Sequence, residues 1–257
     1  MFTTTNELAA VWNAYAAGNL DLAVKLAEAA LADAALAESQ HEGPLWQLRG
    51  LIHRDRGEAA SCVDALERAS LLIPLDAVSR VTLADAYAKI GSCDLARDLF
   101  VGLFADGTMT VELLMQIGVS LDAIDQPRLA MKACQIAAER DPERSQPYYD
   151  MGYYAARCGY PVHVVESLAW RAISLEPNRV NYRIGLASLL AKHDRLDEAH
   201  AVVRWITSQQ VDTINCLCCL ERMAALFEQV GDFGRSAECR DRLSRLAESD
   251  WQADDCQ

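Results

Sequence analysis

The sequence predicts an all-α protein built from about seven helix-turn-helix repeats, and two observations carry this prediction. Small residues recur every 34 residues, at Gly50, Ala84, Gly118 and Gly152. A second register has the same interval and consists of Gly57, Gly91, Asp125 and Gly159. Because several registers share one period, they indicate a repeat architecture rather than a chance match.

Each period divides into two helices, as the second unit illustrates. Its first helix is expected over residues 44–56, where Trp46, Gly50 and His53 share one side at i, i+4, i+7 spacing. Gly57 ends that helix, since glycine adopts the left-handed conformation at little cost. The second helix carries Cys62, Leu66 and Ala69 at similar spacing and is closed by Pro74.

The third and fourth units follow the same order of residues. In the third unit Leu83, Ala84 and Tyr87 precede Gly91, and Ala96 and Phe100 follow it. In the fourth, Asp125 occupies the glycine position and is expected to cap the next helix, with Pro127 in its first turn. The glycine and alanine positions allow two helix backbones to approach closely, while bulky residues fill the space beside them.

The remaining units keep less of the pattern. The fifth has Gly152, Gly159 and Pro177, with one extra residue in its turn. The sixth is placed by Leu186-Ala187 and residues 194–199, the seventh by residues 223–243, and the first by residues 18–30. We therefore expect fourteen helices in one solenoid over residues 1–248, followed by a short acidic tail, 249–257. The predicted repeats lie near 5–38, 43–76, 77–110, 111–144, 145–179, 180–213 and 214–248.

These residues resemble the tetratricopeptide repeat (TPR), a 34-residue helix-turn-helix with the pattern W-x2-L-G-x2-Y, A-x3-F and P. The second unit offers Trp46-x3-Gly50-x2-His53 and Cys62-x3-Leu66 for comparison, and the third offers Tyr87 and Ala96-x3-Phe100. The resemblance implies a right-handed superhelix whose first helices line a concave face. It also implies a module that binds peptides or helices of other proteins and performs no chemistry of its own.

The repeat phase predicts which first-helix side chains face this groove. They share an apolar floor with mixed charges at its sides, and they are Arg54, Asp55, Val81, Asp85, Lys89, Met115, Val119, Asp122, Tyr149, Tyr153, Arg157, Ile184, Ser188 and Lys192. Tyrosine and arginine are frequent anchors of interfaces. For Tyr149 and Tyr153, packing between neighbouring first helices is an equally good interpretation.

One known type of TPR groove is disfavoured. The clamp that co-chaperones use for heat-shock protein tails needs Lys, Asn, Asn, Lys and Arg on three successive first helices. The corresponding positions here include Leu8, Trp12, Gln47, Leu51 and Val81.

Composition limits the classes of molecule that the chain is expected to bind. The chain has 257 residues and a formal net charge of −13, with 24 Lys and Arg against 37 Asp and Glu. An acidic protein lacks the basic face that nucleic acid or anionic lipid requires. The sequence also begins without a signal peptide and has nine scattered Cys, so we expect a reduced, cytoplasmic protein.

The function expected from the sequence is a scaffold or adaptor that holds a segment of a partner protein in its groove. The chain has no phosphate-binding loop, HExxH helix or GxSxG elbow, and we expect neither an enzyme nor a cofactor. Three alternatives remain. One is a thiol- or metal-dependent sensor that uses Cys216, Cys218, Cys219 and the neighbouring Cys239. Another is an accessory domain that delivers substrate to a separate enzyme, and the third is a homodimer formed through an end of the array.

Overall fold

The computed structural model describes residues 3–36 and 41–248, and these residues form fifteen helices and no strand. The acidic tail predicted over 249–257 lies outside the described residues. Contacts group the chain into two compact units, residues 1–137 and 138–257, with the division inside one helix. None of the described helices is long and apolar enough to cross a membrane.

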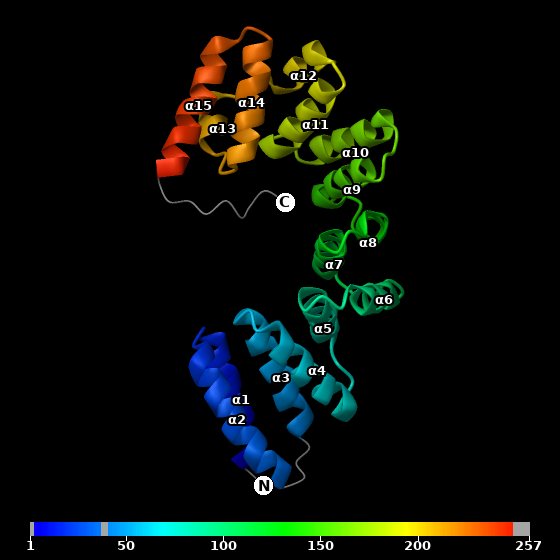
Figure 1. The fold of residues 1–257 in the computed structure, drawn as a ribbon, viewed down its shortest axis with the longest axis vertical. Helices are drawn as coiled ribbons and strands as arrows, with labels where there is room; N and C mark the ends of the chain where they lie inside the picture. Colours follow the sequence, from blue (N-terminus) through cyan, green and yellow to red (C-terminus); the bar gives the residue numbers. More distant parts are fainter. Residues whose placement is uncertain (1–2, 37–40, 249–257) are drawn as a thin grey trace. The chain divides into compact units, whose positions relative to one another are not determined.

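The first unit consists of consecutive helix pairs, coloured blue to green in Figure 1. Its helices are α1 (Thr3–Ala16), α2 (Leu20–Leu36), α3 (Glu42–Asp55), α4 (Ala59–Leu72), α5 (Ala77–Lys89), α6 (Cys93–Leu103) and α7 (Val111–Ala123), with α8 (Pro127–Arg140) at the division. The helices α1, α3 and α5 pack against α2, α4 and α6, and α1, α3, α5 and α7 also contact one another in sequence. This is the alternation that the 34-residue period predicts.

The second unit continues the pattern, with one change. Its helices are α9 (Ser145–Arg157), α10 (Val162–Leu175), α11 (Val180–Lys192), α12 (Leu196–Val203), α13 (Ser208–Asp212), α14 (Leu217–Gln229) and α15 (Phe233–Glu248). The sixth repeat has two short pieces, α12 and α13, where the sequence predicts one second helix. A capping box between Thr207 and Gln210 begins the second piece, so fourteen expected helices become fifteen.

The turn inside each repeat places one residue in the left-handed region. In five turns this residue is glycine, as at Gly57 with φ of 75°, and in two it is Asp125 or Asp194, with φ of 58° and 59°. Asp125 was expected to cap the next helix, and that expectation is wrong, because it takes the glycine's place in the turn. The residue after it closes the turn, since the Gln126 N–H donates to the carbonyl oxygen of Leu121 at 2.9 Å.

The small residues lie where helices approach most closely. Ala84, Ala96 and Ala130 are fully buried. Gly50 is tighter still, because a Cβ built there would lie 2.5 Å from two carbon atoms of Leu66 on α4. Close helix approach is therefore confirmed at Gly50, and the three alanines are buried as expected.

Candidate functional site

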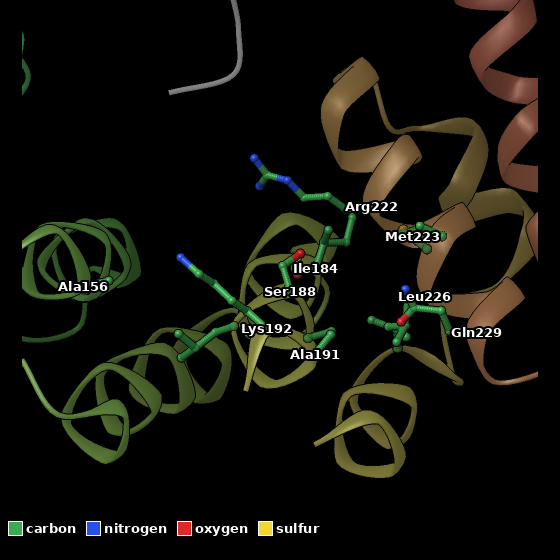
Figure 2. Close-up of a pocket in the computed structure, with 13 residues that line it drawn as sticks. Ala156, Ile184, Ser188, Ala191, Lys192, Arg222, Met223, Leu226 and Gln229 are labelled. Carbon is green, nitrogen blue, oxygen red and sulfur yellow. Dashed lines mark hydrogen bonds between the residues drawn. The ribbon is translucent and has the colours of Figure 1, made fainter. Parts of the chain in front are cut away.

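The second unit contains a pocket of about 500 Å³ between α9, α11 and α14, which we call the main pocket (Figure 2). Its apolar lining includes Ile184 and Ala187 from α11 and Met223 and Leu226 from α14. All four side chains are at least 95% buried, so the helix packing itself forms the lining. Such a rigid apolar surface is typical of binding sites in proteins.

Two cations stand beside this apolar lining. Lys192 ends α11 and Arg222 lies on α14, and in Figure 2 both side chains extend from their helices toward the open side of the pocket. Neither forms an ion pair with an acidic side chain among residues 3–36 and 41–248. In a chain with a net charge of −13, two cations beside one apolar pocket form a local exception to the overall charge.

A smaller pocket of about 160 Å³ adjoins the main pocket and shares Ala156, Leu189 and Arg222 with it. Tyr149 and Tyr153 of α9 contribute to its walls. Tyr153 is 54% exposed, so its ring is available to a partner. The two pockets together form a continuous surface over the first helices of the last three repeats.

Tyr149 is held by its neighbours much more firmly than Tyr153. Its ring lies 4.6 Å from that of Tyr182, and a Cβ built on Gly185 would lie 2.3 Å from its hydroxyl oxygen. Burial raises the pKa of Tyr149 to about 12, so its hydroxyl stays protonated. Tyr149 therefore contributes a fixed wall, while Tyr153 presents a free face.

A polar network ties α9 to α11 beside these tyrosines. The Tyr182 hydroxyl donates to Gln146 at 3.0 Å, and the Gln146 amide N–H donates to Asp150 at 2.7 Å. Burial raises the pKa of Asp150 to about 6, against the opposing effects of Gln146 and Arg179. Asp150 is thus a carboxyl group whose ionisation costs the folded state free energy.

The first helices of the first unit are joined by polar bonds at several of the predicted groove positions. The Tyr15 hydroxyl donates to Asp55 at 2.7 Å, and Arg54 donates to Tyr15 at 3.0 Å. Further along, Ser120 donates to Asp85 at 2.8 Å, and Lys89 pairs with the same carboxylate at 2.9 Å. Arg54, Asp85 and Lys89 therefore bond to this chain at positions where the sequence predicts contacts with a partner.

The other predicted groove residues are distributed between the core and the surface. Val81 is fully buried and offers no surface to a partner. Met115 is half-buried, while Val119 and Arg157 are exposed. Of the fourteen predicted groove residues, the structure brings five together around the two pockets, all in the second unit: Tyr149, Tyr153, Ile184, Ser188 and Lys192.

Sequence reasoning missed Arg222, which lines both pockets. The signal was present, because Arg222 lies 34 residues after Ser188, a position that the repeat phase assigns to the groove. The predicted groove residues lie in the second to the sixth units, and Arg222 occupies the equivalent position in the seventh. Extending the same phase by one period would have found it.

Three cysteines gather where α14 begins. Cys216 caps the helix by accepting the backbone N–H of Cys219 at 3.1 Å, and its sulfur lies 3.0 Å from that of Cys218. The three sulfur atoms all lie within 4.8 Å of one another. Cys239, which was expected to approach this cluster, is instead buried in α15 and does not belong to the group.

Known structures share this fold across nearly the whole chain. A tetratricopeptide repeat protein from Parabacteroides merdae ATCC 43184 is 14% identical, with a TM-score of 0.68 over 95% of this chain and 93% of that one. The C-terminal part of a TPR repeat-containing protein from Cytophaga hutchinsonii is 12% identical, with a TM-score of 0.66 over 96% and 97%. PilF from Pseudomonas aeruginosa is 18% identical, with a TM-score of 0.58 over 80% and 93%.

No family model and no curated protein matches the sequence. At such low identity the structural likeness establishes the fold alone. The chain has the α-α solenoid fold of these tetratricopeptide repeat structures, as the resemblance implies.

Proposed function

We propose that this chain is a protein-interaction scaffold whose second unit holds an acidic, apolar segment of a partner protein. TPR structures support the general role, that of a module for protein interactions. The observation that carries the specific proposal is the main pocket, where an apolar lining is flanked by Lys192 and Arg222. In the first unit, polar groups of the first helices, such as Tyr15 and Asp55, bond to one another.

The proposed binding depends on both the shape of the main pocket and the charge beside it. An apolar side chain of the partner would enter the pocket between α11 and α14, losing contact with water. A carboxylate nearby in the same segment would lie beside the guanidinium of Arg222 or the ammonium of Lys192. Because the lining is already fixed by packing, the partner bears most of the ordering entropy and the protein loses little.

Tyr153 and Arg222 would act as anchors at one end of the segment. Tyr153 exposes an aromatic ring in the smaller pocket, and the Arg222 side chain lines both pockets. Aromatic and arginine side chains carry a large share of the binding energy in many interfaces. We also propose the cytoplasm as the compartment, since free cysteines such as Cys62 and Cys93 are typical of a reducing environment.

A peptide selection followed by charge reversal tests the proposal. Random peptides displayed on phage are selected for binding to the full chain. The dissociation constants of the selected peptides are then measured by fluorescence anisotropy. The double variant Lys192→Glu, Arg222→Glu should weaken binding by about tenfold or more, which corresponds to about 1.4 kcal/mol. The selected peptides should combine Asp or Glu with Leu, Ile or Phe within a few residues.

A matched control keeps the total charge change the same. Lys25 and Lys132 are exposed lysines on α2 and α8, and the double variant Lys25→Glu, Lys132→Glu should bind as the wild type does. Equal losses in both variants would indicate a general electrostatic effect and contradict a site at the main pocket. Full binding by the Lys192→Glu, Arg222→Glu variant would contradict it as well.

A further inference from the structure

We propose that the acidic tail, residues 249–257, lies in the main pocket of its own chain when no partner is bound. This inference rests on the proposed function, because it assigns a competitor to the surface that the partner would use. The chemistry of the tail, the place where α15 ends and the charge beside the pocket support it. The tail is then an internal ligand that a partner segment has to displace.

The tail has the chemistry that the main pocket favours. Its sequence, Ser-Asp-Trp-Gln-Ala-Asp-Asp-Cys-Gln, contains three aspartates and neither lysine nor arginine. Trp251 is its one large apolar side chain, and it directly follows Asp250. The main pocket offers an apolar lining to the indole ring, and Lys192 and Arg222 offer positive charge to the carboxylates. The chain therefore carries a segment of the kind that the proposed function requires of a partner.

The last turns of α15 place the beginning of the tail beside the beginning of α14. Arg242 donates to the carbonyl oxygen of Ile214 at 3.3 Å and to the side chain of Asn215 at 2.9 Å. Arg245 donates to Asp212 at 2.7 Å. These three acceptors lie just before α14 in the sequence, and α15 ends three residues after Arg245. The tail therefore leaves α15 near the N-terminal end of α14.

The N-terminal half of α14 also borders the main pocket. Arg222 follows the N-cap, Cys216, by six residues and lines both pockets. Its side chain extends toward the open side of the main pocket (Figure 2). On α11, Ile184 precedes Cys218 by one period of 34 residues, so the repeat phase places it beside the first turn of α14. The part of the pocket lined by Ile184 and Arg222 is thus the part nearest to the end of α15.

The tail is long enough to reach this part of the pocket. An extended chain spans about 3.3–3.6 Å per residue, so nine residues reach about 30 Å. The six residues from Cys216 to Arg222 rise about 9 Å along the helix axis, and a helix is about 10 Å across. A path from the end of α15 around α14 to Arg222 is therefore about 20 Å long, which is shorter than the reach of the tail.

Charge and tethering both favour the tail as the occupant. Within the described part of the chain, neither Lys192 nor Arg222 forms an ion pair with an acidic side chain, so both remain available to the aspartates of the tail. A short flexible connection holds a segment near its site at an effective concentration on the order of millimolar. Even a weak contact then fills the pocket in a large fraction of the molecules.

A methyl NMR spectrum of the isoleucines, recorded on the full chain without any peptide, tests the proposal. The variant Trp251→Ala removes an aromatic ring that would shift the Ile184 signal, so this signal should differ from that of the wild type. The difference should be the same at low and at high protein concentration. The control variant Trp12→Ala removes a half-exposed indole from α1 and should leave the Ile184 signal unchanged.

Three results would overturn the proposal. The first is an Ile184 signal that is the same in Trp251→Ala and in the wild type. The second is an equal shift in the Trp12→Ala control, which would show that the change is not specific to the tail. The third is a difference that is present only at high protein concentration, since the occupant would then be the tail of a second copy.

The affinity for a selected acidic, apolar peptide separates this proposal from the proposed function. Trp251→Ala should bind the peptide at least about threefold more tightly than the wild type, because the tail competes less well. Unchanged affinity in this variant, with binding still lost in Lys192→Glu, Arg222→Glu, would overturn the tail proposal and leave the proposed function standing. If no peptide depends on Lys192 and Arg222, the proposed function fails, and the Ile184 comparison still decides whether the tail lies in the pocket.

Discussion

At the scale of single residues, the turns of this solenoid depend on backbone conformation more than on side-chain contacts. Gly57 has a φ of 75°, and a Cβ built there would meet nothing within 4 Å. A substitution at this site therefore isolates the cost of the left-handed backbone from any steric clash. Gly102, in the last turn of α6, has equally open surroundings but no positive φ.

These two glycines provide a matched pair of variants. Gly57→Ala should destabilise the protein by about 1 kcal/mol, since a left-handed alanine is strained. Gly102→Ala should instead stabilise it by up to about 1 kcal/mol, because alanine restricts the unfolded chain and favours helix. Urea unfolding of both variants measures the difference. Losses of the same sign and size would show that the turn conformation is not the cause.

The residue scale also shows why the predicted role of Asp125 was wrong. The 34-residue register placed Asp125 with Gly57 and Gly91, but its residue type favoured a capping role. The structure gives it the glycine conformation, which Asp tolerates better than most residues. Position in the repeat was thus a better guide than residue type.

At the scale of helices, equivalent glycines need not have equivalent roles. Gly50 and Gly152 occupy the same register, 102 residues or three periods apart. A Cβ at Gly50 would lie 2.5 Å from Leu66, whereas one at Gly152 would be at ordinary contact distance, 3.5 Å or more, from α10. The α3–α4 pair is therefore packed more closely at this position than the α9–α10 pair.

This contrast predicts opposite effects of one substitution. Gly50→Ala should destabilise the protein by about 1–3 kcal/mol, because Leu66 is fully buried and has nowhere to move. Gly152→Ala should be neutral or slightly stabilising, since alanine favours helix. Thermal unfolding of the two variants gives the comparison. A larger loss at Gly152 would contradict the observed spacing of the helices.

The Asp150 carboxyl makes the α9–α11 contact dependent on pH. Its folded pKa of about 6 lies above its usual 3.8, so the folded state binds the proton more tightly than the unfolded state does. Folding stability therefore declines as pH rises from about 4 to about 6, and the full loss persists above that range. The effect is the reverse of that for an ordinary ion-paired aspartate.

Replacing Asp150 with Asn should remove this dependence. At pH 7.5 we expect Asp150→Asn to be more stable than wild type by about 1–2 kcal/mol, and at pH 4 the two should nearly coincide. Denaturant unfolding at both pH values measures this. A variant that is less stable at pH 7.5 would indicate that the ionised carboxylate stabilises the fold.

At the scale of the whole molecule, the 34-residue period predicted nearly all the helices. It did not predict which parts of the first helices stay open to a partner. Val81, for example, is fully buried on the predicted groove side, whereas Tyr153 is 54% exposed. The exposure of a first-helix side chain depends on the distance between neighbouring first helices. The repeat period of one sequence does not give that distance.

The repeat also does not show which first-helix side chains bond within the chain. The first helices of the first unit exchange polar bonds such as Tyr15–Asp55, and those of the second enclose an apolar pocket beside two cations. A single sequence shows which residues are present. It does not show whether a polar side chain bonds within the chain or stays available to a partner protein. The proposed function rests on the main pocket and the two cations beside it.

The most direct test is a methyl NMR spectrum of the isoleucines, recorded with and without a selected acidic, apolar peptide. Ile184 lines the main pocket, whereas Ile52 and Ile117 are buried in the first unit. We expect the Ile184 signal to shift on binding and the signals of Ile52 and Ile117 to stay unchanged. A bound peptide that shifts Ile52 or Ile117 and leaves Ile184 unchanged would contradict it.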